Sequence, residues 1–529
     1  MQKLKQLSAA IAVAIGAAAL TTPAHAVTPG AVPSANRVYV SGATATDNAL
    51  KALFLRAGTG TAPAVCRSPT TATAGTIDVY IDGTDVTKNT STAILCTLNV
   101  AVGSLAAGSN VALVKESAGG SDRGTVLVAE ATAITTFRSL DDLTGCSAGT
   151  TVTANSNTSF PSHQEFVLHS GCTASQSPAV NAQIGVADVD PQLFNVGTSA
   201  ITKAQISRLT ADPLYQPMFG VAVSLNLYRA LQRAQGKTLD DTGANLPTLT
   251  TGQVRYLFQD LGAQSWGDAV VSSTGVPITD TSFTNGVTVS SQVYVCRRGD
   301  ESGTQASTAQ YFFNERCALA AGAQKFANAT NADQQNGEVF TRASSEAFTV
   351  FANKGSGDVR TCLDAHNDVD HFAIGLLGSE SVYNGPGSLG GLAHAADGTG
   401  QWRYVALDGR KPTLEEVANG HYDFVMENVL NRRKSAYNGF PVISGPQLAV
   451  YNYVKSSFAN IDVIKTLLIT ANTHGTTGGL AGGLSGIPNA VPVSTTTLLA
   501  NPVSAFTKSP NGTANNCGPA LPVAATSTN

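Results

Sequence analysis

The sequence predicts an α/β protein, because strand-like and helix-like segments alternate along most of its 529 residues. Short apolar runs have the length of buried strands, and several are followed by segments whose apolar residues recur at helical spacing. Turns of small residues follow these strands, at the end where open α/β sheets hold their ligands. The expected strands span 37–40, 110–114, 183–187, 219–228, 292–295 and 372–377, and the expected helices span 47–57, 251–261 and 305–317.

The first expected unit, residues 37–57, combines a strand of β-branched and aromatic residues, a turn of Gly, Ala and Thr, and a helix. Two further strands in this part of the chain, 110–114 and 183–187, run into the small-residue turn 115–120 and into Asp188. The helix is expected from its apolar residues, namely Leu50, Leu53, Phe54 and Leu55.

Two tracts between these strands, residues 58–109 and 134–180, are rich in Thr, Ser and Gly. Thr favours strands, whereas Ser and Gly favour turns, and none of the three favours a helix interior. We therefore expect β-rich or loop insertions at these two places.

The second part of the chain begins with a nearly continuous apolar run, 219–228, as expected for a strand buried on both faces of a sheet. An amphipathic pattern predicts a helix over 251–261, and 372–377 reads as another buried strand. Residues 402–417 read as a strand, a glycine turn and a helix. The final segment, 473–529, is rich in Gly, Thr and Pro and shows no periodic pattern.

Charge is sparse in this chain. Charged residues make up 13% of the sequence and the net charge is −4, whereas about a quarter of the residues in an average globular protein are charged. Nothing in this balance favours nucleic acid or a membrane surface as a partner.

The first 26 residues are expected to be a cleaved secretory signal. Their apolar run is too short to span a bilayer, and no later stretch is long and apolar enough for a membrane helix. We therefore expect a protein that is not inserted in a membrane and is located in the periplasm or outside the cell. The signal is predicted from Lys3, Lys5, the run 9–20 and the small residues Ala24 and Ala26.

Eight cysteines lie beyond this signal, an even number that suggests disulfides in an exported chain. Cys66–Cys96 and Cys146–Cys172 are the expected local pairs. A bond between Cys296 and Cys317 is disfavoured, because a helix between them would separate them by roughly 20 Å, against a Cα limit of about 7 Å. Pairing of Cys317 with Cys362 is an open alternative. No two cysteines have the C-x-x-C spacing of a zinc site, so no metal is expected.

The strongest candidate for a functional turn is residues 298–304, Arg-Gly-Asp-Glu-Ser-Gly-Thr, between an expected strand and an expected helix. A helix N-terminus offers unpaired N–H groups and the positive end of the helix dipole. With hydroxyls and a guanidinium added, this turn predicts a site for a small oxyanion.

Other functions are less well supported by the residues. Gly-Asp-Glu-Ser-Gly at 299–303 differs from a protease nucleophile turn, and no partner histidine segment precedes it. The tripeptide 298–300 as an adhesion motif is equally weak. No paired-carboxylate, P-loop or dinucleotide-binding pattern stands out, so we expect neither catalysis nor a cofactor. One polar cluster could hold a metal but is better explained as solvated loop residues: Asp364, His366, Asp368, Asp370 and His371.

Several segments together resemble the phosphate-binding proteins that supply bacterial phosphate ABC transporters, which are two-lobed proteins of the type 2 substrate-binding fold. The matching segments occur in family order and cover most of residues 37–430. They are VYVSGATATDNALKALF, KESAGGS, IGVADVDP, PLYQPMFGVAVSLNL, LTTGQVRYLFQDLGAQSWGD, RRGDESGT and LDGRKPTLEEVANGHYDF.

The resemblance implies a phosphate site made by both lobes. Hydroxyls and N–H groups would donate to phosphate oxygens, and Arg298 would add a charged fork. Asp300 would orient Arg298, and Asp188 would accept the P–OH proton that sulfate lacks, which would discriminate between the two anions. The implied ligand residues are Thr44, Ala45 through its N–H, Ser117, Asp188, Arg298, Asp300, Ser302, Gly303 and Thr304.

The same resemblance implies a division of the chain into lobes. Lobe one would span 37–212 and carry both insertions, lobe two would span 213–380, and 381–472 would return to lobe one. The chain would cross between the lobes near 213–220 and near 372–380. The last segment, 473–529, would follow these lobes.

The implied function is a monomeric, exported, non-enzymatic protein that captures inorganic phosphate, with an inner-membrane ABC permease as a possible partner. Large insertions and an atypical segment after Tyr422 put permease docking in question. The alternative is a secreted, surface or matrix protein that reuses the fold without transport, and a phosphatase is a weaker third reading.

Overall fold

A computed structural model describes the chain between residues 27 and 522, so the expected signal lies outside the described residues. The following segments within that span are also not described: 68–76, 87–88, 135–136, 138–139, 142–144, 157–162, 173–179, 195–199, 260–264, 316, 318–347, 379–380, 382–400, 414–415, 418–419, 461–462, 464–481, 484–502, 505, 510–513 and 519–520.

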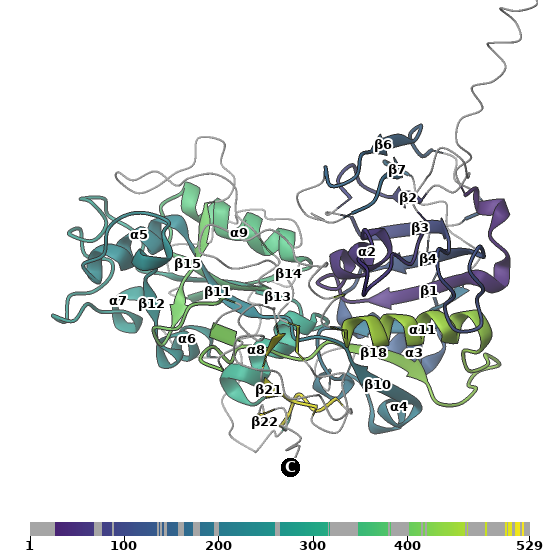
Figure 1. The fold of residues 1–529 in the computed structure, drawn as a ribbon. Helices are drawn as coiled ribbons and strands as arrows, with labels where there is room; N and C mark the ends of the chain where they lie inside the picture. The colour runs from purple at the N-terminus through teal and green to yellow at the C-terminus, as the bar shows by residue number, and fades with distance from the viewer. Residues whose placement is uncertain are drawn as a thin grey trace, which may run out of the picture.

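The protein is a mixed α/β structure built around two sheets, and Figure 1 shows each sheet at the centre of one half of the molecule. In the first half, β1 pairs in parallel with β4 and with β9, and β18 pairs antiparallel to β9. The nine strands in spatial order are β10 (Leu209–Pro213), β18 (Val429–Arg433), β9 (Ile184–Ala187), β1 (Arg37–Gly42), β4 (Asn110–Glu116), β3 (Ser91–Thr97), β2 (Asp78–Ile81), β7 (Phe166–His169) and β6 (Thr150–Val152).

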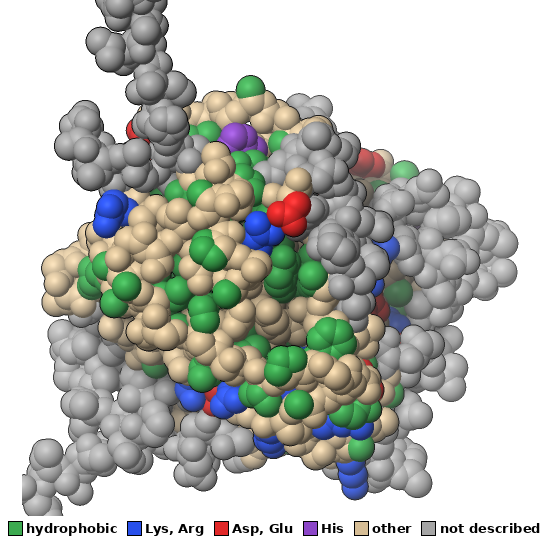
Figure 2. Space-filling model, turned by 90° about the vertical axis from the view of Figure 1, so that its right-hand side faces the viewer, with side chains coloured by type: hydrophobic (Ala, Val, Ile, Leu, Met, Phe, Trp, Pro, Cys, Tyr) green, Lys and Arg blue, Asp and Glu red, His purple; other side chains and the backbone are tan. Residues whose placement is uncertain are grey.

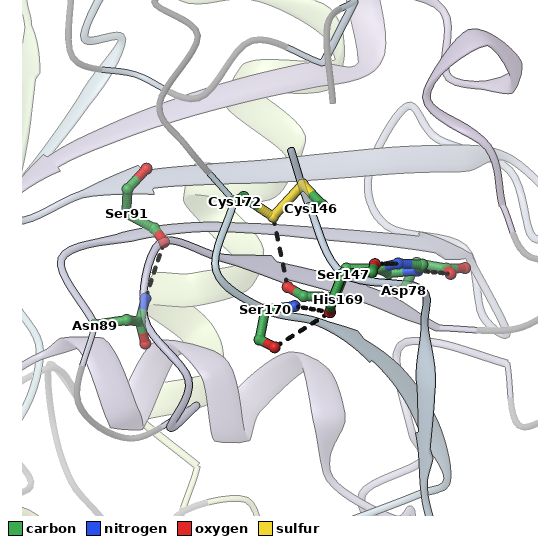
Figure 3. The surroundings of a disulfide bond; sticks show 8 residues. All are labelled: Asp78, Asn89, Ser91, Cys146, Ser147, His169, Ser170 and Cys172. Atoms are coloured by element: carbon green, nitrogen blue, oxygen red, sulfur yellow. Dashed lines mark hydrogen bonds and ion pairs between the residues drawn. A yellow bond between two sulfur atoms is a disulfide. The ribbon is translucent and has the colours of Figure 1, made fainter. Parts of the chain in front are cut away.

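The two insertions are β-rich where they are described, and they extend this sheet by four strands, β3, β2, β7 and β6. Each insertion contains one of the expected local disulfides, Cys66–Cys96 and Cys146–Cys172, and both are confirmed. Figure 3 shows the second bond beside a contact between the insertions, where His169 Nε2 lies 3.2 Å from Asp78 Oδ1. The insertions are therefore part of the sheet of the first half.

The main sheet of the second half has five strands among the described residues, of which β13 pairs in parallel with both β14 and β15. Their spatial order is β14 (Phe348–Asn353), β13 (Val293–Arg298), β15 (Ala373–Gly378), β11 (Phe219–Ser224) and β16 (Trp402–Tyr404). All six residues of β11 are buried, as its apolar run predicted. The strand ends at Ser224, however, and the remainder of the expected 219–228 strand is helical, because a short apolar run does not distinguish the two structures.

Helices and short elements complete both halves. In the first half these are η1 (Pro29–Ala31), η2 (Ser34–Asn36), α2 (Asp47–Leu55), η3 (Ser121–Gly124), α3 (Val126–Glu130), β5 (Ala133–Ile134), β8 (Val180–Asn181), η4 (Pro191–Leu193), α4 (Lys203–Arg208) and α11 (Gly445–Phe458). In the second half they are α5 (Leu225–Ala234), η5 (Gly243–Asn245), β12 (Thr248–Leu249), α6 (Thr251–Phe258), α7 (Trp266–Ala269), α8 (Gly303–Phe313), α9 (Ser356–Asp368) and β17 (Ala406–Leu407). Short strands in the last segment are β19 (Gly482–Gly483), β20 (Val503–Ser504), β21 (Phe506–Thr507) and β22 (Leu521–Pro522).

The chain passes from the first sheet to the second through residues 214–218 and returns through 424–428. The two crossing segments are hydrogen-bonded to each other, for example from Leu214 N to the Asn428 carbonyl at 2.8 Å. The return expected near 372–380 is wrong, because β15 occupies those residues and pairs inside the second sheet with β13 and β11. The second half therefore extends well beyond residue 380.

The C-terminal segment packs against the returning crossing at Glu427, which is fully buried. Glu427 Oε1 accepts hydrogen bonds from Gln216 Nε2 on the other crossing, at 3.0 Å, and from Thr507 Oγ1, at 2.6 Å. Asn516 donates to the Glu427 carbonyl and accepts from its N–H. One carboxylate thus ties the end of the chain to both crossings.

Two long-range disulfides replace the pairings left open by the sequence. Cys296 on β13 bonds to Cys362 on α9, and Cys317 bonds to Cys517, 200 residues away. The alternative pair Cys317–Cys362 is wrong, because α9 packs against β13 and presents Cys362 to Cys296.

The outer face of the first half carries few charged side chains, as Figure 2 shows, in keeping with the low charge content of the sequence. Among the described helices, none is long and apolar enough to cross a membrane.

Candidate functional site

The predicted ligand turns lie at the carboxyl ends of four strands. Because β1, β4 and β9 are parallel neighbours, their ends at Gly42, Glu116 and Ala187 share one edge of the first sheet. β13 of the second sheet ends at Arg298, directly before the turn that opens α8. Turns from the two halves meet, since Asp122 N donates to the Glu301 carbonyl at 3.2 Å.

The turn after β1 requires a glycine at its first position. Gly42 has φ +114°, and a Cβ there would lie 2.0 Å from the Val186 carbonyl oxygen. Thr44 and Ala45, the first two predicted ligand residues, follow in this turn and are half-buried. They stand immediately before the N-terminus of α2, which is the position that the anion-site prediction gives them.

Ser117 lies in the adjacent turn after β4, but its hydroxyl is engaged within the protein. Its Oγ lies 2.5 Å from Asp47 Oδ2 and 2.9 Å from the Thr90 carbonyl oxygen, and both of these atoms are acceptors for its proton. A hydroxyl has a single proton to donate. The expected donation from Ser117 Oγ to a ligand is therefore replaced here by a contact that fixes the turn to α2.

A buried ion pair supports these two turns and was not found from the sequence. Lys115 Nζ lies 2.9 Å from Asp47 Oδ1 and donates to the Gly42 carbonyl at 2.7 Å. The contact depends on the pairing of β1 with β4, which no local pattern reveals.

Asp188 follows β9 and is 3% exposed. Its Oδ2 accepts a hydrogen bond from Ser121 Oγ at 3.0 Å, whereas its Oδ1 is buried and has no hydrogen-bond partner among the described residues. Burial raises the pKa of Asp188 to about 6, and the hydrogen bond from Ser121 and the positive charges of Arg298 and Lys115 act in the opposite direction. The side chain is a buried acceptor held in one orientation.

The opposite wall is the start of α8. Ser302 occupies the N-cap position, yet its hydroxyl makes no capping hydrogen bond and is buried without a partner among the described residues. Gly303 and Thr304 are the first two residues of the helix and are buried. Their N–H groups lie in the first turn, where a helix offers no internal acceptor. Gly303 packs directly on Asp188, because a Cβ at this position would lie 2.5 Å from Asp188 Cβ.

Arg298 ends β13 and is 4% exposed. Its Nη1 donates to Ser356 Oγ at 3.0 Å and its Nη2 to the Lys354 carbonyl at 2.7 Å, which fixes the guanidinium beside the turn. Asp300, expected to orient Arg298, forms an ion pair with Arg297 Nη1 at 3.0 Å.

The expectation of solvated loop residues near residue 366 is wrong in part, because Asp364, His366 and Asp368 lie on α9 and His366 is buried. Asp364 and Asp368 accept hydrogen bonds from Gln401, and the rings of His366 and His371 both stack on Tyr294. Within the described residues, one grouping has the proximity of a metal site, Cys296, Cys362 and His366. Both sulfurs of that grouping form a disulfide and offer no thiolate.

No family model and no curated protein matches this sequence. Among solved structures, similar chains include a substrate-binding protein with bound phosphate from Clostridium perfringens, at 14% identity, with 55% of this chain and 79% of that chain covered and a TM-score of 0.28. An ABC-type phosphate transport receptor from Vibrio cholerae is similar at 12% identity, covering 54% and 77% of the two chains, with a TM-score of 0.27. PstS from Borrelia burgdorferi is similar at 10% identity, covering 54% and 77%, with a TM-score of 0.25. These scores are low, so the functional argument rests on the residues of the site.

Proposed function

We propose that this protein binds inorganic phosphate, or a similar protonated tetrahedral oxyanion, between the turn at Asp188 and the N-terminus of α8. The observation that carries the proposal is a buried acceptor next to buried donors. Asp188 Oδ1 and Ser302 Oγ both lack partners among the described residues, and Gly303, which follows Ser302, packs against Asp188. Buried polar groups are nearly always paired, so two unpaired atoms on segments that pack against each other support a ligand between those segments.

The donors suit an anion. The first turn of α8 supplies N–H groups and the positive end of the helix dipole, and Ser302 adds a hydroxyl. Arg298 contributes a fixed positive charge, while Thr44 and Ala45 would approach from the start of α2. In this proposal Ser117 and Asp300 do not bind the ligand. They support the site indirectly, Ser117 by its hydrogen bond to Asp47 and Asp300 by its ion pair with Arg297.

The acceptor suits a protonated anion. A carboxylate beside an anion is repulsive unless the anion carries a proton that the carboxylate can accept. Phosphate retains such a proton near neutral pH and sulfate does not, so a sulfate ion would leave Asp188 Oδ1 buried and unpaired. We therefore propose that Asp188 selects phosphate over sulfate.

Binding is favoured over catalysis at this site. Ser302 Oγ, the hydroxyl best placed to act as a nucleophile, has no hydrogen bond to a base among the described residues. Nucleophilic serines are activated by an adjacent base. The favoured role is therefore that of a non-enzymatic solute-binding protein.

The cellular role in this proposal is phosphate capture outside the inner membrane, by a monomer that delivers phosphate to an ABC permease. The four disulfides fit an oxidising compartment. The second candidate, a secreted or surface protein without transport, is favoured by the four-stranded extension of the first sheet. Phosphate uptake by cells with and without the gene distinguishes the two roles.

Isothermal titration calorimetry tests the proposal directly. The protein is first freed of co-purified phosphate by reversible unfolding and dialysis, and then titrated with phosphate and with sulfate at pH 7.5. We expect saturable binding of phosphate and at least about tenfold weaker binding of sulfate, since a lost charge-assisted hydrogen bond costs about 1.5–3 kcal/mol. A refolded protein that gives no phosphate heat would overturn the proposal.

A further inference from the structure

Ser121 ends the segment KESAGGS but is not among the implied ligand residues, and it makes two hydrogen bonds to Asp188. It is the first residue of η3 and is 1% exposed. Its Oγ donates to Asp188 Oδ2 at 3.0 Å and accepts from the Asp188 backbone N–H at 3.2 Å. One hydroxyl therefore bridges the backbone and the side chain of the same aspartate.

This bridge determines which carboxylate oxygen remains available. A carboxylate can turn about its side-chain bonds, and it has two equivalent oxygens for an incoming proton donor. Because Ser121 engages Oδ2 and is itself held by the Asp188 N–H, Oδ1 is the oxygen left without a partner among the described residues. The availability of Oδ1 as a buried acceptor is thus a consequence of Ser121.

We propose that Ser121 is a positioning residue for anion selectivity, which holds Asp188 so that Oδ1 receives the proton of the bound oxyanion. The inference rests on the proposed function and adds a residue to it. Ser121 does not contact the ligand in this scheme. It acts through Asp188, by fixing the carboxylate before the ligand arrives, so that binding does not have to order the side chain.

The same hydroxyl lies at the contact between the two halves. A Cβ on Gly303 would lie 2.5 Å from Ser121 Oγ as well as from Asp188 Cβ, and a Cβ on Gly120 would lie 3.1 Å from the Glu301 carbonyl oxygen. The N-terminus of α8 therefore rests on the Ser121–Asp188 pair. The residue that orients the Asp188 carboxylate therefore also contacts the helix whose first N–H groups would donate to the anion. This contact fixes the position of the acceptor relative to the donors.

Ser117 does not serve this purpose, although it lies in the same turn. Its hydroxyl donates towards Asp47 and the Thr90 carbonyl, on the side of α2. The two serines thus have different roles: Ser117 holds the turn against α2, and Ser121 holds the carboxylate of Asp188.

A double-mutant cycle tests the role of Ser121. The variants Ser121→Ala, Asp188→Asn and the double variant are titrated calorimetrically with phosphate and with sulfate between pH 6.5 and 8.5. We expect Ser121→Ala to weaken phosphate binding about tenfold and sulfate binding by less than about twofold, because the loss concerns the acceptor of the ligand proton. In the Asp188→Asn background the same substitution should leave the phosphate-to-sulfate ratio unchanged, because Ser121 acts through the carboxylate.

Ser207→Ala is the matched control, since Ser207 is an exposed residue of α4 and its hydroxyl donates to the Ala204 carbonyl, three positions earlier in the same helix. If Ser121→Ala does not fold, Ser121→Gly removes the same hydroxyl. An unchanged phosphate-to-sulfate ratio in a folded Ser121 variant, beside a wild-type protein that binds phosphate, would overturn the positioning role. An equal loss in the Asp188→Asn background would also overturn it, and a wild-type protein that binds neither anion would instead overturn the proposed function.

Discussion

Lys115 and Asp47 form an ion pair that is almost entirely removed from solvent. The Nζ–Oδ1 distance is 2.9 Å, and the two side chains are 5% and 6% exposed. Lys115 comes from the end of β4 and Asp47 from the first residue of α2, so the pair joins the two turns that precede the proposed site. Removing one partner of such a pair leaves the other as an uncompensated buried charge.

We therefore predict that Lys115→Met lowers the free energy of unfolding by about 3–5 kcal/mol. Urea denaturation followed by circular dichroism measures this change. The control is Asp141→Asn, because Asp141 pairs with Arg37 at the surface and its side chain is 72% exposed. An exposed pair contributes at most about 1 kcal/mol, so equal losses in the two variants would contradict the prediction.

The pKa of Asp188 gives a second prediction, a loss of phosphate affinity in acid. Burial raises this pKa to about 6. The carboxylate form accepts the ligand proton, and below pH 6 an increasing fraction of Asp188 is protonated and no longer accepts. After correction for the protonation of phosphate itself, affinity should fall by up to about tenfold between pH 6 and pH 5. Calorimetry across this range measures it, and a flat profile in wild-type protein would contradict it.

Acid should affect folding stability and phosphate affinity in opposite directions through Asp188. Because the folded-state pKa of Asp188 lies above the unfolded value of 3.8, ionisation of this group costs stability above pH 6, and that cost diminishes as the pH falls from 6 towards 3.8. Asp188→Asn, which does not ionise, should show neither dependence. Weaker phosphate binding in acid therefore reports on the site, and does not reflect unfolding caused by Asp188.

A third prediction concerns Gly303→Ala, which should push the N-terminus of α8 away from Asp188. The new Cβ would lie 2.5 Å from Asp188 Cβ, closer than packed atoms approach. Overpacking of this kind costs about 1–3 kcal/mol, so we expect phosphate binding to weaken about tenfold or more. Gly252→Ala is the control, because a Cβ at the start of α6 would meet only Thr250 Oγ1, at 3.8 Å. Equal affinities in the two variants would show that α8 does not need this close approach.

The bond between Cys317 and Cys517 provides a fourth prediction. It joins residues 200 positions apart, whereas Cys66–Cys96 joins residues 30 apart. In the chain-entropy model a longer loop restricts the unfolded chain more, by about 1.7 kcal/mol for these two lengths. Replacing both cysteines of each pair by serine should therefore lower the melting temperature more for the longer loop. Calorimetric melting measures both variants, and a larger loss for Cys66–Cys96 would contradict the prediction.

The features that the sequence predicted depend on short segments. The alternation of strands and helices, the turns near Thr44 and Ser302, and the disulfides Cys66–Cys96 and Cys146–Cys172 are all set by residues close together in the chain. Periodicity and turn chemistry act over that range, so these predictions succeed for a physical reason.

The features that it did not predict depend on contacts between distant segments. Ser121 contacts Asp188 across 67 positions, and Gln216 contacts Glu427 across 211. The return crossing was assigned to β15 because an apolar run alone does not reveal which sheet it joins. The ion pair of Arg297 with Asp300 was likewise not predicted, because it depends on how the turn after β13 folds.

The position of β18 in the first sheet has a consequence for the order of synthesis. β18 lies between β9 and β10, although it is encoded more than two hundred positions after both. A growing chain would thus hold the edge of β9 unpaired until residues 429–433 were made, and exposed strand edges are prone to pair with other chains. Glu427 would remain without Thr507 and Asn516 for longer still. The end of the chain therefore determines when its beginning can finish folding.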